Sequence, residues 1–366
     1  MAPLTITPPL LNSANPWCTT LEQLQELYDS AYTGAITTRT SLLNGFPHDP
    51  AVHQFAFYDP TNHVASPSNV DQAGKPNDTG SLNTLGYSPI LLEEYLGFIK
   101  SISQGLPSRP EGGREHFKPV VISVTGSVEE VVACYKLITS CQRAVRMVLA
   151  MEINLSCPNI PGKPPPAYDS ASLLTYLNVL KIEINRQISE DGTSAHPHTG
   201  HTHVPIGIKT PPYTYQDQYN GLIKALKDSA LAEPEHLPCP ITFITSCNTL
   251  GSSLLLSPQL EGFAGGQSHE VFHRTLESVT RTGIGGLAGA PLHPLALGNV
   301  YTIKGVLFQH KELEHIQIIG VGGVEDAAGY KRMRAVGAAA VAVGTALGRK
   351  GVKVFEEIGG ELDTSR

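Results

Sequence analysis

One stretch of the chain, Glu152 to Pro164, brings together side chains that could carry out acid–base chemistry. It places a thiol, Cys157, between two carboxamides, Asn154 and Asn159. The apolar residues from 148 to 155 predict a strand, and the Pro and Gly residues between 158 and 164 end it in a constrained loop. A lone cysteine in a turn is often a packing residue. The two amides beside it instead favour a site that binds a polar ligand and moves a proton.

Two cationic side chains stand at the ends of other predicted strands. Lys209 is the last residue of the strand 204–209, and Arg39 ends the β-branched stretch 34–39. An unpaired buried ammonium is costly, so we expect Lys209 to contact a ligand or a carboxylate. For Arg39 two interpretations stay open: a solvated salt-bridge partner, or a residue that faces a ligand at the rim of a barrel.

Three glycine-rich turns lie in the C-terminal part of the chain, at 282–289, 320–324 and 344–345. The second and third each follow an apolar strand and precede a predicted helix, the former at 325–336. Glycine lets backbone N–H groups approach an anion, and a helix N-terminus favours negative charge. Two such turns on the last two strands of a βα series predict a phosphate site of the kind common in barrels.

The elements that must position these residues alternate between strands and helices. We expect helices at about 88–103, 170–188 and 215–230, and further helices capped by Thr20 and by Ser127 with Glu130. Leu10 to Trp17 is predicted to be a loop. This pattern predicts an α/β protein, a (β/α)8 TIM barrel with loop insertions over its C-terminal face, where polar strand ends converge. The eight predicted strand ends are Arg39, Asn83, Val124, Asn154, Lys209, Cys247, Gly320 and Val343.

The composition is that of a loop-rich globular chain, with 35 Gly and 28 Pro among 366 residues. Its net charge of −7 is mild and scattered, so we expect no nucleic-acid surface. Residues 1–15 lack a basic residue and no window has the ~20 apolar residues of a membrane span, which predicts no targeting segment and no membrane association. Six cysteines without a CxxC pair predict reduced thiols in the cytoplasm. The histidines within 189–203 predict an insertion loop and no metal site.

Taken together, the motifs resemble class 1A dihydroorotate dehydrogenase. The resemblance covers most of residues 10–43 and 80–360. The chain has a cysteine in the loop where the membrane-associated class of the family has a serine base. The Pro-Gly-Lys-Pro sequence at the end of this loop favours the single-subunit class over the class that has an iron–sulfur partner. The segments that carry it are Asn154-Leu-Ser-Cys-Pro-Asn-Ile-Pro-Gly-Lys-Pro164, Gly207-Ile-Lys-Thr-Pro-Pro-Tyr213, Cys247-Asn-Thr249, Gly320-Val-Gly-Gly323 and Gly344-Thr-Ala-Leu347.

The resemblance implies FMN as cofactor, dihydroorotate as substrate, fumarate as the family's usual second substrate, and a homodimer. In the family, a loop thiol removes the C5 proton while hydride passes from C6 to the flavin, and by position that base is Cys157. The implied substrate-binding residues are Arg39, Asn83, Leu85, Gly86, Asn154, Asn159, Asn248 and Thr249. The implied cofactor-binding residues are Ser13, Ala14, Arg39, Thr40, Asn154, Lys209, Gly285, Gly286, Gly322, Gly323, Gly344 and Thr345, of which the last four would bind the phosphate.

Three positions depart from the family pattern. Arg39 stands where the family has a lysine, Asn12-Ser-Ala-Asn15 replaces Asn-Ala-Ser-Gly, and Asn83-Thr-Leu-Gly86 replaces Asn-Ser-Met-Gly. They leave open a flavin enzyme acting on another pyrimidine-like or enone substrate, a non-redox barrel such as a phosphosugar isomerase or lyase, and a non-catalytic paralogue that binds flavin or pyrimidine. We expect residues 1–366 to form one FMN-binding domain with insertions near 44–79, 104–117 and 189–204.

Overall fold

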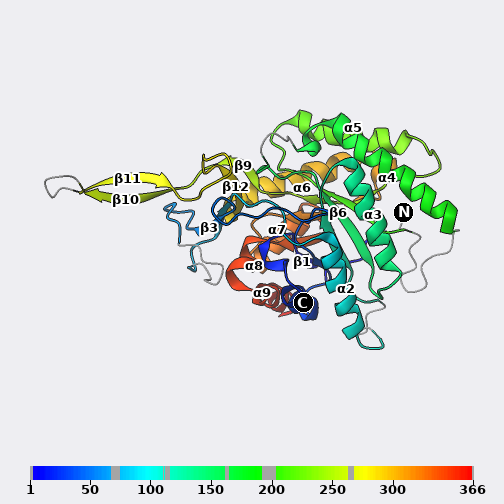
Figure 1. Ribbon diagram of the computed structural model, residues 1–366, viewed down its shortest axis with the longest axis horizontal. Coiled ribbons are helices and arrows are strands. Elements are labelled where there is room, and N and C mark those ends of the chain that lie inside the picture. Colours follow the sequence, from blue (N-terminus) through cyan, green and yellow to red (C-terminus); the bar gives the residue numbers. More distant parts are fainter. Residues whose placement is uncertain are drawn as a thin grey trace.

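Eight parallel strands form the centre of the computed structural model (Figure 1), which describes residues 3–66, 75–109, 111, 116–160, 165–191, 203–262 and 268–364. Their order is β1-β14-β13-β8-β7-β6-β5-β2. The predicted TIM barrel is therefore confirmed. The strand bounds are β1 Leu10–Asn12, β2 Ile36–Thr37, β5 Val120–Val124, β6 Leu149–Asn154, β7 Ile206–Lys209, β8 Ile241–Ser246, β13 Gln317–Val321 and β14 Ala340–Val343.

The barrel closes between its two shortest strands, β1 and β2, through a side chain. Asn12 is fully buried, and its Nδ2 donates to the carbonyl of Thr37 at 2.6 Å while its Oδ1 accepts from the Thr37 N–H at 2.9 Å. The Gly34 N–H also donates to the Leu10 carbonyl at 2.8 Å. The carboxamide thus supplies the donor and the acceptor that a neighbouring strand would otherwise provide.

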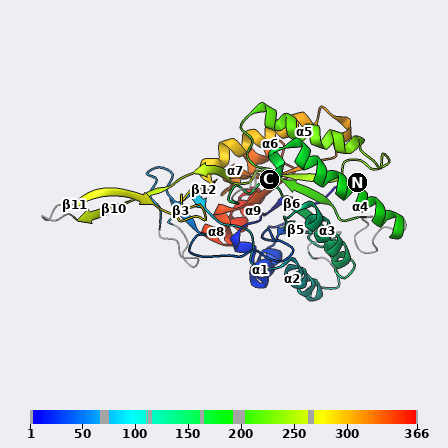
Figure 2. The same cartoon turned by 45° about the horizontal axis from the view of Figure 1, so that its top comes forward.

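Helices surround the strands on the outside (Figures 1 and 2). The predicted caps of Thr20 and Ser127 are confirmed: each begins a helix with a capping box, to Gln23 and to Glu130 respectively. The helices predicted near 88, 170, 215 and 325 are also present. The bounds are α1 Leu21–Asp29, α2 Leu92–Gly105, α3 Val128–Gln142, α4 Ser170–Asp191, α5 Gln216–Leu231, α6 His293–Leu307, α7 Ala327–Ala335, α8 Thr345–Lys350 and α9 Lys353–Thr364.

Side chains alternate across the barrel strands and so divide the core in two. On β6, Ala150 packs in a small cluster with Val121 and Phe243 from β5 and β8, which fills the barrel. Leu149 and Met151 belong instead to the larger core between strands and helices. Because Glu152 and Asn154 share the face of Ala150, the strand directs these two polar side chains into the barrel at its carboxyl end.

A second sheet, antiparallel, lies over the carboxyl ends of the barrel strands. It has the order β3-β4-β12-β9 and is inserted after β2 and after β8. Beyond it, the hairpin β10 Leu256–Gly262 with β11 Ser268–Arg274 projects from the body (yellow in Figure 1). The bounds of the sheet are β3 Phe55–Tyr58, β4 Gly80–Asn83, β9 Leu250–Ser253 and β12 Gly285–Gly289.

Three predicted elements were wrong. Leu10–Asn12, predicted as loop, is the first barrel strand; with three residues it is too short to show a hydrophobic period. The segment ending at Asn83 was counted as a barrel strand, but it is β4 of the antiparallel sheet. The glycine-rich stretch 282–289, predicted as a turn, contains the strand β12, which pairs with β4. The two strands approach so closely that a Cβ at Gly285 or Gly289 would lie 2.2 Å from the carbonyl oxygen of Asn83 or Thr79, respectively. Glycine here permits close pairing rather than a turn.

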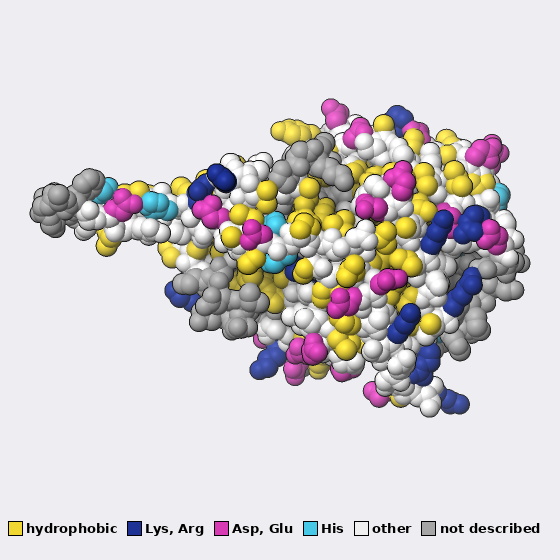
Figure 3. Space-filling model, in the orientation of Figure 1, with side chains coloured by type: hydrophobic (Ala, Val, Ile, Leu, Met, Phe, Trp, Pro, Cys, Tyr) yellow, Lys and Arg dark blue, Asp and Glu magenta, His cyan; other side chains and the backbone are white. Residues whose placement is uncertain are grey.

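Acidic and basic side chains are interspersed over the face seen in Figure 3, with histidine and acidic side chains along the hairpin. No described helix is both long and apolar enough to cross a membrane. Within the described ranges, no group of three His, Cys, Asp or Glu side chains could hold a metal ion. The predicted histidine-rich loop lies almost entirely outside those ranges.

Replacing Asn12 by Ala should lower the free energy of unfolding by about 2–4 kcal/mol, because it leaves the N–H and C=O of Thr37 unpaired in a buried seam. Urea denaturation followed by circular dichroism measures the loss. Asn220→Ala is the matched control, since Asn220 is exposed and its side chain accepts one bond from Gln216; we expect a change within about 0.5 kcal/mol. An Asn12→Ala protein as stable as the control would show that the amide does not close the barrel.

Candidate active site

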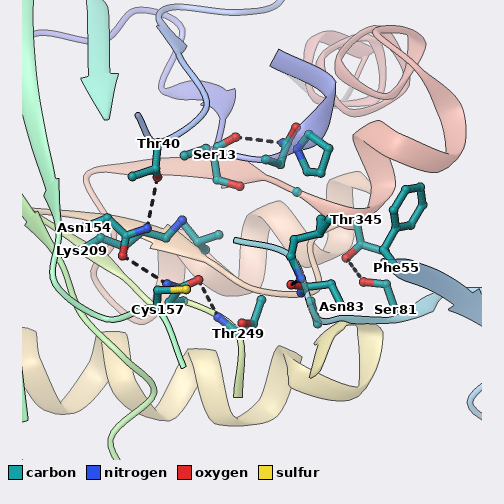
Figure 4. Close-up of a pocket in the computed structure, with 18 of the residues that line it drawn as sticks. Ser13, Thr40, Phe55, Ser81, Asn83, Asn154, Cys157, Lys209, Thr249 and Thr345 are labelled. Atoms are coloured by element: carbon teal, nitrogen blue, oxygen red, sulfur yellow. Dashed lines mark hydrogen bonds between the residues drawn. The ribbon is translucent and has the colours of Figure 1, made fainter. Parts of the chain in front are cut away.

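A pocket opens between the carboxyl ends of the barrel strands and the antiparallel sheet (Figure 4). The space that it encloses is about 1040 Å³ when the solvent at its open mouth is included. The predicted residues that line it are Ser13, Ala14, Arg39, Thr40, Asn83, Leu85, Gly86, Asn154, Cys157, Asn159, Lys209, Asn248, Thr249, Gly322, Gly323, Gly344 and Thr345.

The loop that carries the thiol is held by Asn154, the last residue of β6. The Asn154 Nδ2 donates to Thr40 Oγ1 at 3.1 Å, and its Oδ1 accepts from Ser156 Oγ at 3.0 Å and from Asn248 Nδ2 at 3.3 Å. One amide thus joins the ends of three barrel strands to the turn that follows. Cys157, three residues after Asn154, is partly exposed, whereas the other five cysteines are buried.

A second amide joins this loop to the antiparallel sheet. Asn159 Nδ2 donates to Asn83 Oδ1 at 3.0 Å and to the Leu85 carbonyl at 2.9 Å. Asn83 in turn donates to the carbonyl of Gly286 on β12 at 3.1 Å. The amides therefore fix one another's orientation, and as groups with both donors and acceptors they suit a polar ligand.

Burial raises the pKa of the Cys157 thiol. The N–H of Asn159, the side chain of Tyr87 and the charge of Lys209 all act in the opposite direction. With the pKa above its ordinary value, the group is mainly a thiol at neutral pH, and its basic form is the thiolate. The three opposing contacts are those that would stabilise this thiolate.

Two cations line the pocket, the buried Lys209 and the partly buried Arg39, and neither has an acidic partner in the described part of the chain. Lys209 is 4% exposed, and its ammonium has no hydrogen bond or ion pair within the described part of the chain. Arg39 is partly buried and burial lowers its pKa, and its Nη2 has no hydrogen-bond partner among the residues that the structure describes. No Asp or Glu is among the described residues that line the pocket. Buried unpaired cations are costly, so the pocket favours an anionic ligand.

Strand β6 also carries a carboxylate, Glu152, whose side chain lies inside the barrel and not in the pocket. Glu152 is 2% exposed and accepts from Ser123 Oγ at 2.9 Å and from Thr245 Oγ1 at 2.5 Å. Ser123 also bonds Thr40 Oγ1 at 2.9 Å, which continues to Asn154. These hydroxyls connect the polar layer inside the barrel to the rim of the pocket.

Glycines form the wall at the far end of the pocket. Gly322 and Gly323 have φ values of +137° and +65°, a region that L side chains rarely adopt. A Cβ at Gly323 would lie 2.6 Å from the Gly289 carbonyl, and one at Gly344 would lie 3.1 Å from Ser13 Oγ. Thr345 begins α8, and its Oγ1 bonds Ser81 Oγ at 2.8 Å. Because the first N–H groups of a helix lack partners inside it, this wall can bind a phosphate.

His293 supports the same wall from behind. Its Nδ1 lies 2.7 Å from the Gly322 carbonyl, and its Nε2 accepts from Arg332 Nε at 3.0 Å. This pairing requires the proton on Nδ1 and a neutral ring. The imidazole therefore fixes the glycine turn and does not itself supply charge to the pocket.

The loop that follows β1 explains one departure from the family pattern. Asn15 has an extended φ of −158° and caps the short helix Pro16–Cys18, accepting from the Trp17 N–H at 2.8 Å. Its Nδ2 donates to the Ser13 carbonyl at 2.8 Å. A residue in this conformation need not be glycine, so the substitution keeps the loop and adds a cap.

Two predicted residues, Gly285 and Gly286, do not line the pocket; their strand β12 contributes Ala288 and Gly289 instead. Sequence reasoning also missed an aromatic wall, in which Trp17 contacts Phe55 edge-on at 5.4 Å. The aromatic-rich run Phe55-Ala-Phe-Tyr58 was a usable signal for a strand. The other lining residues that were missed include Ser81, Tyr87, Cys247, Leu292 and Val321.

The chain matches the family model described as dihydroorotate dehydrogenase over residues 73–365. It is 26% identical over 356 residues to dihydroorotate dehydrogenase A (fumarate) of Lactococcus lactis subsp. cremoris, covering 97% of this chain and 89% of that one. It is 25% identical over 361 residues to dihydroorotate dehydrogenase (fumarate) of Saccharomyces mikatae, covering 97% and 88%.

Among solved structures, the ligand-free dihydroorotate dehydrogenase of Eimeria tenella has a TM-score of 0.66 at 15% identity, covering 98% of this chain and 84% of that one. That likeness is one of fold. The family match is broader evidence, because it spans well over half of the 366 residues and includes the thiol loop, both glycine turns and the lysine strand. The chain belongs to the dihydroorotate dehydrogenase family.

Proposed function

We propose that the protein oxidises (S)-dihydroorotate to orotate with FMN as cofactor, in pyrimidine biosynthesis. The observation that carries the proposal is the pocket itself, in a chain of this family: around one cavity lie a partly exposed thiol, two hydrogen-bonded pairs of amides, and two cations without an acidic partner among the described residues. We further propose that residues 1–366 act as one FMN-binding domain, with the insertions where the sequence predicts them.

The pocket has features that suit FMN. Its glycine wall suits the phosphate, and the ammonium of Lys209 suits the electron-rich edge of the ring system. When bound, FMN accepts the hydride that leaves the substrate. Gly285 and Gly286 would act from behind, by letting β12 pack closely on Asn83 and Thr249. The residues proposed to hold the cofactor directly are Ser13, Ala14, Arg39, Thr40, Asn154, Lys209, Gly322, Gly323, Gly344 and Thr345.

The amides and one cation would hold the substrate. Dihydroorotate presents two N–H groups, two ring carbonyls and a carboxylate, which require donors and acceptors at fixed positions. The unpaired Arg39 Nη2 is the donor most in need of an anion. The proposed set is Arg39, Asn83, Leu85, Gly86, Asn154, Asn159, Asn248 and Thr249.

Cys157 is the proposed base that takes the C5 proton. Its raised pKa sets the expected pH dependence: the thiolate fraction, and with it the rate of substrate oxidation, increases as pH rises toward the pKa and levels off above it. A serine at this position would need a still higher pH, since its hydroxyl is a weaker acid.

The electron acceptor is proposed from the relatives. Both named relatives are fumarate-type enzymes, and we propose fumarate, a cytoplasmic location and a homodimer here. Orotate formation measured anaerobically with fumarate, and separately with a quinone, tests which electron acceptor the protein uses. Turnover with fumarate supports the proposal; turnover with the quinone alone would assign the protein to another class, and turnover with neither would remove both compounds as electron acceptors.

A second candidate is an FMN enzyme that acts on another pyrimidine-like or enone substrate. The forked, unpaired guanidinium of Arg39, in place of the family's lysine, favours it. A protein that binds FMN yet is not reduced by dihydroorotate would support this candidate.

Replacing Cys157 by Ala should leave FMN bound and slow its reduction by dihydroorotate about 10²–10⁴-fold, the contribution of a positioned general base. Stopped-flow absorbance measures the rate. Cys141→Ala, which removes a buried thiol on α3, should react as the wild type does. If both variants reduce at the wild-type rate, Cys157 is not the base.

Replacing Arg39 by Gln should raise the KM for dihydroorotate about 10–100-fold, the effect of losing a hydrogen bond to a charged acceptor. Arg39→Lys should have a smaller effect, because it keeps the charge and loses the fork. Steady-state kinetics and flavin content measure both. Arg186→Gln, on the exposed face of α4, is the control. A wild-type KM in Arg39→Gln would show that this guanidinium contacts no substrate.

A further inference from the structure

Cys157 and Tyr87, together with Asn154, line two neighbouring cavities at once. Both line the active-site pocket, and both line a second cavity of about 610 Å³, mouth included, whose walls also carry Thr125, Tyr176 and Phe46. A ligand in the first pocket meets the thiol from one side. The second cavity lets a protein side chain approach the same sulfur without entering the position of the ligand.

The backbone holds Tyr87 in this place. Asn159 ties the cysteine loop to Asn83 and Leu85, the second of which precedes Tyr87 by two residues. The Tyr87 ring packs edge-on against Phe46, with centroids 5.8 Å apart. The phenol is thus restrained from both sides, by the loop that carries the thiol and by an aromatic contact.

The neighbours of the thiol leave few candidates for a hydrogen bond to it. Burial raises the pKa of Tyr87, so its hydroxyl is a proton donor at neutral pH. The Tyr176 hydroxyl already donates to the Gly126 carbonyl at 2.8 Å. Burial also raises the pKa of Cys247, to about 12, so that thiol stays neutral. The charged groups that line the pocket around the sulfur are Arg39 and Lys209.

We propose that Tyr87 is a positioning residue for the base, whose hydroxyl donates a hydrogen bond to the Cys157 thiolate from the side of the second cavity. As the substrate C5–H bond breaks, the S–H bond forms, and Tyr87 keeps its own proton throughout. The hydrogen bond stabilises the thiolate before the reaction and directs a lone pair of the sulfur at the ligand. This inference rests on the proposed role of Cys157, so its test uses no substrate.

The test is the rate of alkylation of Cys157 by iodoacetamide, in the purified full-length protein, from pH 7 to pH 10. Peptide mass spectrometry identifies the labelled cysteine, and Cys157→Ala provides the blank. Tyr87→Phe is compared with wild type and with Tyr176→Phe, which removes a hydroxyl from the same second cavity. If circular dichroism shows that Tyr87→Phe is unfolded, Tyr87→Leu takes its place.

Tyr87→Phe should be alkylated about tenfold more slowly at each pH between 7 and 9, with the rates converging at higher pH, because loss of a donor to a charged acceptor raises the thiol pKa by about one. Tyr176→Phe should stay within about twofold of wild type. Equal rates in Tyr87→Phe and wild type, or equal slowing in both phenylalanine variants, would overturn the inference.

The result is separable from the proposed function. A slowed Tyr87→Phe in a protein that forms no orotate would leave the inference standing and remove the function. If Tyr87→Phe is alkylated as fast as the wild type in a protein that does form orotate, the function stands and the inference about Tyr87 is wrong.

Discussion

The constraint on which the site depends is uncompensated positive charge. Lys209 and Arg39 stand at or just after the ends of β7 and β2, mostly removed from water, and no carboxylate lines the pocket with them in the described part of the chain. A barrel can tolerate this arrangement because its strands are held independently of the site, by the packed interior around Ala150 and by the helix-facing core. The missing counter-charge must then come from a ligand, and phosphate, carboxylate and thiolate are the anions that the proposed chemistry places there.

Much of the fold was predictable because the longer strands and helices keep the hydrophobic periodicity that is typical of each. The caps at Thr20 and Ser127 and the barrel class were correct, as was the number of barrel strands. One of the eight strands was assigned wrongly, because β4 was counted as a barrel strand in place of β1. β1 has three residues, and its contact with β2 is completed by the Asn12 side chain, which no periodicity reveals. β4 has a strand-like sequence, but whether a strand joins a barrel or a covering sheet depends on partners far along the chain.

The candidate site was predictable where it follows strand ends and glycine turns, and was not where it depends on inserted segments. Asn154, Lys209 and the turn at Gly322 lie directly after barrel strands, so position alone brings them together. Phe55 lines the pocket only because the antiparallel sheet folds over it, and Tyr87 only because Asn159 ties two distant loops. Their roles depend on pairing between segments, which a single sequence does not record.

The departures from the family pattern differ in how much they change the pocket. Asn15 is accommodated by extended backbone and adds a cap, so it changes little around the pocket. Arg39 changes the shape of a cation whose Nη2 has no partner among the described residues, and it therefore bears on which anion the site accepts. The glycine wall of the pocket, by contrast, consists of residues at which a Cβ would clash with its neighbours, which leaves it less open to substitution.

The most direct measurement is the visible absorbance of the purified protein under anaerobic conditions, before and after dihydroorotate is added, and again after fumarate. The account predicts a flavin band that bleaches with dihydroorotate and returns with fumarate. A flavin band that dihydroorotate leaves unchanged, or a protein with no flavin band after FMN is supplied, would contradict it.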